Sequence, residues 1–226
     1  MERGKILQHH PRLPDLPIGL TSFGAVCCNN AIFVWGGHCG AAHEYYREGQ
    51  NRWLFQLDLE RQDGWQRIHE SATGRQGLAL VAYQNQIYRV GGFEARNSKQ
   101  QDQDLHSVAY FEVFDWDNAS WRSLSHLPES RSSFDAVIIE NQLFVAGGWS
   151  LSENDDVEWL TDAHCIDLSQ SNPTWETVPA PPFRRRAIST ATQDGKLYVI
   201  GGMQINGGPT RQVSIFDPQT GVWSTG

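Results

Sequence analysis

The chain repeats one short phrase four times, and this repeat limits what it can fold into more than any other feature. An apolar stretch runs directly into two adjacent glycines at "IFVWGG", "IYRVGG", "LFVAGG" and "LYVIGG". The first glycines of the four pairs follow one another at steps of 55, 56 and 54 residues. A regular period of about 50 residues is typical of repeat architectures, in which one structural unit recurs along the chain. At 226 residues, the repeats fit within a single all-β domain.

Each repeat predicts a β-hairpin that ends at its glycine pair. Two residues with turn character stand just upstream of each pair: Asn29-Asn30, Gln84-Asn85, Glu140-Asn141 and Asp194-Gly195. The second of the two is always Asn or Gly, which tolerate the positive φ of a two-residue hairpin turn. Farther along, each repeat has an Asp and then a Trp: Asp58 and Trp65, Asp115 and Trp121, Asp167 and Trp175, Asp217 and Trp223. This pattern predicts a third and a fourth strand, and no stretch has a helical period.

A repeated four-stranded unit of this kind is a propeller blade. The diglycine after the second strand, the Asp that ends the third and the Trp of the fourth resemble the kelch repeat, and the resemblance covers essentially the whole chain. It implies an all-β, kelch-type β-propeller of four four-stranded blades in one domain, at about residues 20–70, 75–127, 131–180 and 185–226. The residues expected to build the repeat are Gly36, Gly37, Gly91, Gly92, Gly147, Gly148, Gly201, Gly202, Trp65, Trp121, Trp175 and Trp223.

The four blades predict an incomplete ring. The kelch family usually closes its ring with more blades, and the segment "ILQHHPRLPDLP" aligns with the ends of outer strands at "WRSLSHLPESR" and "WETVPAPPFRR". Residues 6–17 are therefore expected to form a stray outer strand. The alternative is that this strand completes the last blade and closes an unusually small ring.

One face of the propeller is expected to bind a ligand. The loops between the second and third strands are long, and long loops on a rigid scaffold are where binding usually resides. An arginine stands 16 residues before three of the four glycine pairs, whereas Leu20 breaks the pattern in the first repeat. These guanidinium groups are candidates to take a carboxylate or phosphate. The alternative is that they bond carbonyls and acidic side chains of adjacent blades. The candidate binding residues are Arg75, Arg131, Arg185, Arg186, Phe134 and Trp149.

Composition argues against several other ligands. The formal net charge of -8 disfavours nucleic acid and anionic membranes as partners. The loop "HCGAAHEYY" holds two histidines and a cysteine, but no second cluster completes a metal site, and "SENDDVEW" lacks the spacing of a calcium loop. We therefore predict no metal and no cofactor. The N-terminus has no apolar signal-peptide core, so the chain as it stands is predicted to be cytoplasmic, and exported only if its N-terminus is truncated.

Three functions fit the sequence. The first is a non-catalytic scaffold that binds an unidentified protein, a peptide or an acidic small ligand through its long-loop face, with no assigned catalytic residue. The second is a sugar-handling propeller that resembles the sialic acid mutarotases, suggested by the "LPDLPIGL" opening. The third is a copper radical oxidase that resembles galactose oxidase, whose Tyr-His dipeptide is missing here. The binding scaffold is favoured, and enzymatic activity stays undecided.

Overall fold

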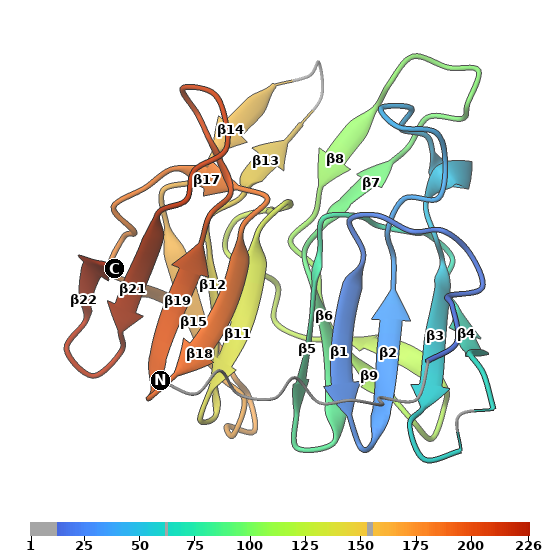
Figure 1. The fold of residues 1–226 in the computed structure, drawn as a ribbon, viewed down its shortest axis with the longest axis horizontal. Coiled ribbons are helices and arrows are strands. Elements are labelled where there is room, and N and C mark those ends of the chain that lie inside the picture. The colour runs from blue at the N-terminus through green and yellow to red at the C-terminus, as the bar shows by residue number, and fades with distance from the viewer. Residues whose placement is uncertain (1–12, 62, 153–155) are drawn as a thin grey trace, which may run out of the picture.

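The computed structural model describes residues 13–61, 63–152 and 156–226 and consists of four antiparallel sheets of four strands (Figure 1). Blade 1 contains β1 (Gly24–Cys28), β2 (Ala31–Trp35), β3 (Trp53–Asp58) and β4 (Gln66–Glu70). Blade 2 contains β5 (Ala79–Tyr83), β6 (Gln86–Val90), β9 (Phe111–Asp115) and β10 (Ser120–Ser123). Blade 3 contains β11 (Asp135–Ile139), β12 (Gln142–Ala146), β15 (Ala163–Asp167) and β16 (Trp175–Val178). Blade 4 contains β18 (Ser189–Gln193), β19 (Lys196–Ile200), β21 (Val213–Asp217) and β22 (Val222–Thr225).

Three further pairs of short strands rise from the loops at one end of the blades. They are β7 (Phe93–Ala95) with β8 (Leu105–Ser107), β13 (Trp149–Leu151) with β14 (Val157–Trp159), and β17 (Arg185–Arg186) with β20 (Met203–Gln204). The first loop of this kind instead holds a short 3-10 helix, η1 (Arg47–Gly49). The all-β prediction is therefore confirmed, and the described residues contain no helix long and apolar enough to cross a membrane.

Turn chemistry explains the regularity of the blades. Both residues of the predicted hairpin turn have positive φ in blades 1, 2 and 4, whereas in blade 3 only Glu140 does. At the other turn of each blade, the aspartate that ends the third strand accepts backbone N–H groups of the turn. Asp115 Oδ1, for example, accepts from Asp117 N at 3.0 Å and Asn118 N at 3.1 Å. Side chains of this type close a turn locally, which joins the third strand to the fourth.

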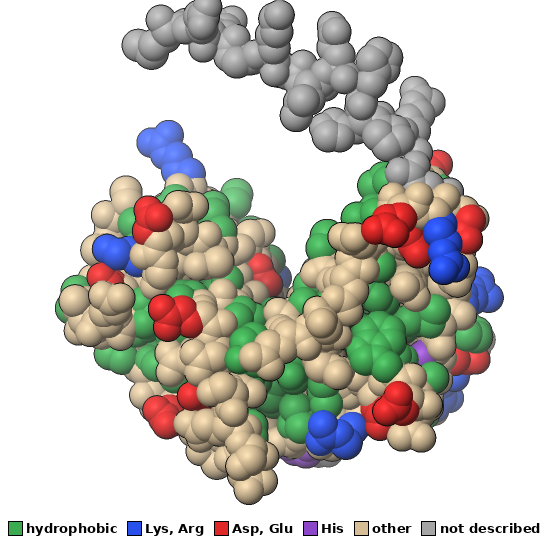
Figure 2. Space-filling view, turned by 90° about the horizontal axis from the view of Figure 1, so that it is seen from below, with side chains coloured by type: hydrophobic (Ala, Val, Ile, Leu, Met, Phe, Trp, Pro, Cys, Tyr) green, Lys and Arg blue, Asp and Glu red, His purple; other side chains and the backbone are tan. Residues whose placement is uncertain are grey.

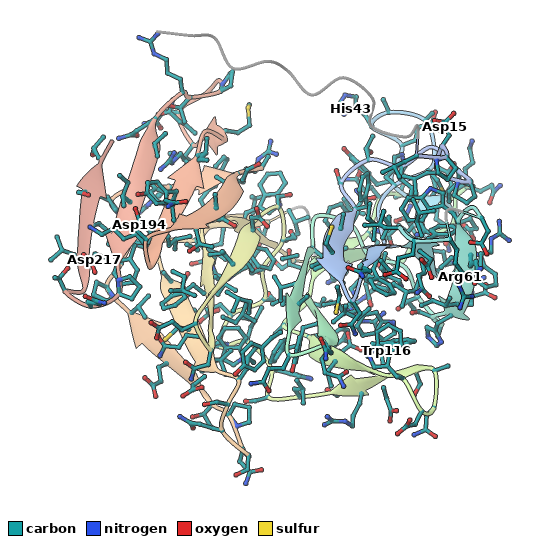
Figure 3. The ribbon with its side chains drawn as sticks, turned by 60° about the horizontal axis from the view of Figure 1, so that its bottom comes forward. Asp15, His43, Arg61, Trp116, Asp194 and Asp217 are labelled. Atoms are coloured by element: carbon teal, nitrogen blue, oxygen red, sulfur yellow. The ribbon has the colours of Figure 1, made fainter. Side chains whose placement is uncertain are left out.

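The blades stand side by side in an open arc. The innermost strands pack in the order β1, β5, β11 and β18, and among the described residues β18 does not pack against β1 in the same way. Figure 2 shows the hollow that separates the two ends of the arc. In Figure 3, Asp194 and Asp217 lie on blade 4 at one end, and Asp15 and Arg61 lie near blade 1 at the other. The predicted incomplete ring of four blades is therefore confirmed.

Three of the four outer tryptophans donate a hydrogen bond to the segment before their blade, whereas Trp121 Nε1 of blade 2 is buried without a partner among the described residues. Trp175 Nε1 donates to the Ser125 carbonyl at 2.9 Å, and Trp223 Nε1 donates to the Pro179 carbonyl at 2.7 Å. Trp65 Nε1 donates in the same way to Pro14 O at 3.0 Å. Residues near Pro14 thus occupy the place that the end of an outer strand takes at the later junctions. Of the stray strand expected at 6–17, residues 6–12 lie outside the described residues, and 13–17 have no strand assigned.

Candidate functional site

The short strand pairs that carry several candidate binding residues lie on one face of the blades, at the top of Figure 1. Arg185 and Arg186 form β17, and Trp149 begins β13. Phe134 is instead buried in the core between blades 2 and 3, with 5% of its surface exposed. The face therefore presents a mixture of buried and accessible candidates.

The three repeat arginines are buried, and each side chain bonds the backbone of its own blade. Arg75, Arg131 and Arg185 have relative exposures of 1%, 0% and 1%. Each Nη1 donates to the carbonyl of the first glycine of its own blade, at 3.0 Å for Gly91, 2.8 Å for Gly147 and 3.0 Å for Gly201. A charged donor on a buried carbonyl is one of the stronger hydrogen bonds that a protein forms. The spacing of 16 residues therefore reflects this bond.

The main chain of the same arginines meets the glycine pair of the preceding blade. Arg131 O accepts from Gly92 N at 2.8 Å, and a Cβ added to Gly91 would lie 2.5 Å from the same oxygen. Gly147 and Arg185 O stand in the same relation at the next junction. Both glycines also have positive φ, which side chains rarely adopt. The glycine pairs thus allow two blades to approach through their backbones.

Blade 1 obtains the missing donor from another residue. Leu20 stands where the other blades have arginine, and the Gly36 carbonyl accepts instead from Asn51 Nδ2 at 3.0 Å. Asn51 is buried and comes from the end of the long loop that precedes β3. Asn51 lies seven residues before the turn aspartate, where the other blades have Val108, Leu160 and Thr210. Because no amide side chain recurs at this position, the repeat pattern did not identify Asn51 as a donor.

Arg75 shares one carboxylate with Arg89 in blade 2. Its Nη2 bonds Glu112, and the same carboxylate accepts from Arg89 Nη2 at 2.6 Å. Burial would raise the pKa of Glu112, but the bonds and charges of Arg89 and Arg75 lower it below the usual range. Burial, followed by the charge of Arg75, lowers the pKa of Arg89 to about 10. Arg89 interrupts an apolar inner strand, a signal in the sequence that a counter-charge must lie nearby.

In blade 3, the carboxylate that pairs with Arg131 comes from a different position of the repeat. Arg131 Nη2 donates to Asp162 Oδ1 at 2.7 Å, and the other carboxylate oxygen contacts His164 Nε2. Burial would raise the pKa of Asp162, but the His164 bond and the Arg131 charge lower it well below its usual range. Two of the three repeat arginines therefore have a carboxylate partner inside their own blade.

Arg185 has no such partner among the described residues. It donates to the carbonyls of Gly201 and Gln212, the latter at 2.9 Å, and its Nη2 donates to Ser214 Oγ at 2.6 Å. Its Nε is buried without a hydrogen-bond partner. Burial lowers the pKa of Arg185. The guanidinium of blade 4 is therefore held only by neutral groups.

Arg186 lies against two aromatic rings of the neighbouring strand pair. Its guanidinium carbon stands 3.9 Å from the ring centre of Trp149 and 5.6 Å from that of Trp159. Such stacking stabilises a cation and fixes the orientation of the rings. All three side chains are partly exposed. They form the accessible aromatic part of this face.

Two cavities open between blades on the same face. The cavity between blades 1 and 2 has a volume of about 640 Å³, and its lining includes Arg47, Arg52 and Arg96 together with Glu48 and Glu94. The cavity between blades 3 and 4 has a volume of about 460 Å³ and is lined in part by Arg184 and Arg185. The described residues contain no group of three or more His, Cys, Asp or Glu that could hold a metal ion.

Comparisons with known proteins agree with this architecture. The family model described as KLHDC2/KLHL20/DRC7 Kelch-repeats domain matches residues 21–225. Kelch-like protein 35 of Mus musculus is 28% identical over 214 residues, which cover 93% of this chain and 31% of that protein. Kelch repeat and BTB domain-containing protein 12 of Homo sapiens is 24% identical over 218 residues, which cover 92% of this chain and 34% of that protein. The chain thus spans about a third of the length of these curated relatives.

A solved structure described as "Structure of YjhT" shares the fold. The alignment covers 94% of this chain and 67% of that chain, with a TM-score of 0.73 and 14% sequence identity. At this identity the likeness concerns the fold alone.

Proposed function

Because the chain belongs to the KLHDC2/KLHL20/DRC7 Kelch-repeats domain family, we propose that it is a non-catalytic binding module that holds a protein or peptide partner. The partner lies on the face that carries β7–β8, β13–β14 and β17–β20. Kelch propellers typically mediate protein interactions. The sugar-handling and copper-oxidase alternatives gain no specific support from the described residues, and we do not propose them.

The observation that carries this proposal is a continuous, interconnected rim on that face. Arg47 N donates to Asn97 O at 3.0 Å, which ties the long loop of blade 1 to the β7–β8 segment of blade 2. Leu151 N donates to Ser107 Oγ at 3.0 Å, which ties β13 of blade 3 to β8. Arg186 of β17 then stacks on Trp149. A preformed surface of this kind orders few groups on binding, which lowers the entropic cost of association.

Accessible aromatic and arginine side chains on this rim suit a protein or peptide ligand. Tryptophan and arginine are enriched among the residues that dominate binding energy at protein interfaces. Trp149, Trp159 and Arg186 bring three such side chains together, and Ile205 adds an exposed apolar side chain near the β17–β20 pair. The cluster offers a compact anchor for a peptide.

The test is to select peptides from a random library on the purified chain and to measure their affinities for variants. Arg186→Ala is expected to weaken binding of the selected peptides about tenfold, because it removes the cation that stacks on Trp149 beside Trp159. Arg67→Ala is the matched control, since Arg67 stacks in the same manner on Trp53, at 5.0 Å, but on the outer strands of blade 1. Equal affinities for the Arg186→Ala variant and the parent chain would contradict the proposal.

A further inference from the structure

The three repeat arginines make the same backbone contact but differ in charge balance. Arg75 and Arg131 each have a carboxylate partner within their own blade, in Glu112 and Asp162. In blade 4, Ser214 stands where blade 2 has Glu112, because both lie three residues before the turn aspartate. A hydroxyl therefore replaces a carboxylate, and the positive charge of Arg185 is left uncompensated among the described residues.

This uncompensated arginine lines a cavity. Arg185 lines the cavity between blades 3 and 4, and its described hydrogen bonds all go to neutral acceptors. Arg184, the next residue in the wall, is exposed, and no described residue forms a hydrogen bond or ion pair with it. A buried charge without a partner is costly, and a bound group of opposite charge removes that cost. The cavity therefore suits an anion.

The rest of the lining agrees with this interpretation. Among the described residues that line the cavity, none is acidic, whereas Thr161, Asn206 and Gln212 are uncharged and polar. Ile205, with 44% of its surface exposed, and Pro182 give the mouth an apolar edge. By contrast, the cavity between blades 1 and 2 carries Glu48 and Glu94 beside its arginines, so most of its positive charge is compensated within the lining. In a chain of formal net charge -8, the cavity between blades 3 and 4 is locally positive.

We propose that the cavity between blades 3 and 4 binds an oxyanion carried by the peptide partner, a carboxylate or a phosphate, through Arg184 and Arg185. This inference rests on the proposed peptide-binding function and names the chemistry of one subsite of it. A guanidinium group donates in a planar fork that matches both oxyanions. Arg184 provides the accessible fork, and Arg185 provides a fixed positive charge in the wall.

The experiment follows the arginine Nε–H signals of the isotope-labelled chain by NMR during titration at constant ionic strength. Three probes are used: inorganic phosphate, N-acetylaspartate N-methylamide for a side-chain carboxylate, and N-acetylalanine for a chain-terminal carboxylate. We expect saturable shifts of the Arg184 and Arg185 signals, with a dissociation constant on the order of 1 mM. The tightest of the three probes identifies the source of the oxyanion.

Two variants and one control locate the site. Ser214→Asp supplies an internal carboxylate to Arg185 and is expected to weaken the probes about tenfold, as a counter-charge competes with the ligand. Arg184→Gln removes the accessible fork and is expected to weaken them by about the same factor. Arg47→Gln, in the cavity between blades 1 and 2, should leave the titration unchanged. Unperturbed amide signals elsewhere show that each variant is folded.

Absence of saturable shifts in the parent chain, or shifts that survive both Ser214→Asp and Arg184→Gln, would overturn the proposal. The failure of this inference differs from the failure of the proposed function. Selected peptides that still bind and depend on Arg186, while none of the three probes binds, would leave the peptide-binding function intact and remove only the oxyanion subsite. If neither the selected peptides nor any of the three probes binds, both the peptide-binding function and the oxyanion subsite are rejected.

Discussion

Blades 2 and 4 place an arginine in the same position and give it opposite surroundings. Arg75 and Arg185 each donate Nη1 to the first glycine carbonyl of their blade at 3.0 Å. In blade 2, Glu112 accepts from both Arg75 and Arg89, whereas in blade 4 the corresponding contact is Ser214 Oγ. The shared bond fixes where the guanidinium lies. The residue that the neighbouring strand places beside the guanidinium determines whether its charge pairs with a carboxylate inside the fold or remains available to a ligand.

The two blades also differ in how far the stability of the fold depends on the partner of the arginine. A buried ion pair contributes little net stability compared with apolar packing. Removal of one partner is nevertheless strongly destabilising, because it leaves the other charge buried without a counter-charge. Blade 2 is built in this way, with two arginines on one carboxylate. Blade 4 relies on neutral acceptors, so loss of any one of them removes a single hydrogen bond.

Replacement of the blade 2 carboxylate is expected to have the largest effect. Glu112→Gln leaves Arg75 and Arg89 buried with no counter-charge and is expected to lower the free energy of unfolding by about 3–5 kcal/mol. Urea denaturation followed by tryptophan fluorescence measures the change.

The matched variant in blade 4 is Ser214→Ala. It removes one acceptor from Arg185, and the expected loss is about 1–2 kcal/mol. Losses of equal size in the two variants would show that Glu112 and Ser214 play the same role, which would end the distinction between the blades.

The glycine pairs offer a second test of the difference between blades 2 and 4. A Cβ at Gly91 would lie 2.5 Å from Arg131 O and 2.8 Å from Phe134 Cε1, whereas at Gly201 its nearest neighbour is Thr210 O at 3.3 Å. Both glycines have positive φ, at 56° and 62°, so backbone strain is common to the two. Gly91→Ala is therefore expected to destabilise the chain by about 1–3 kcal/mol more than Gly201→Ala, the added cost of overpacking. The melting temperatures of the two variants, measured side by side, decide this, and a Gly201→Ala variant as unstable as Gly91→Ala would contradict it.

The sequence predicted the features that recur at a fixed period. The glycine pairs and the turn residues recur in register, and an outer tryptophan follows each turn aspartate by six to eight residues. Each of these features is required by local backbone geometry or by contact with the adjacent unit. The arginines that precede three glycine pairs recur as well, and their position was evident. The blades and the open arc could therefore be inferred before any coordinates.

The contacts that set the charge of each blade do not keep a register, and this is why they were missed. Glu112 lies three residues before its turn aspartate, whereas Asp162 lies five residues before Asp167. Asn51 replaces the arginine donor of blade 1 from a position that is Val, Leu or Thr in the other repeats. Several positions on a sheet can reach one guanidinium group, so the identity of its partner depends on tertiary packing. Only Arg89, a charge within an apolar strand, signalled that blade 2 needed a carboxylate.

Acid should reduce the difference between the parent chain and the Glu112→Gln variant. The pKa of Glu112 is lowered in the folded state, so its stabilising contribution is present above the unfolded value of about 4.3 and is lost as the pH falls through the folded value. The variant has no group to protonate there, and its stability should change less. We expect the gap in unfolding free energy to narrow by on the order of 1 kcal/mol as the pH falls below about 4. Urea denaturation of both chains at a series of pH values measures the gap, with Ser214→Ala as the control whose difference from the parent should not change. A gap that stays constant or widens in acid would mean that the carboxylate of Glu112 does not carry the charge balance of blade 2.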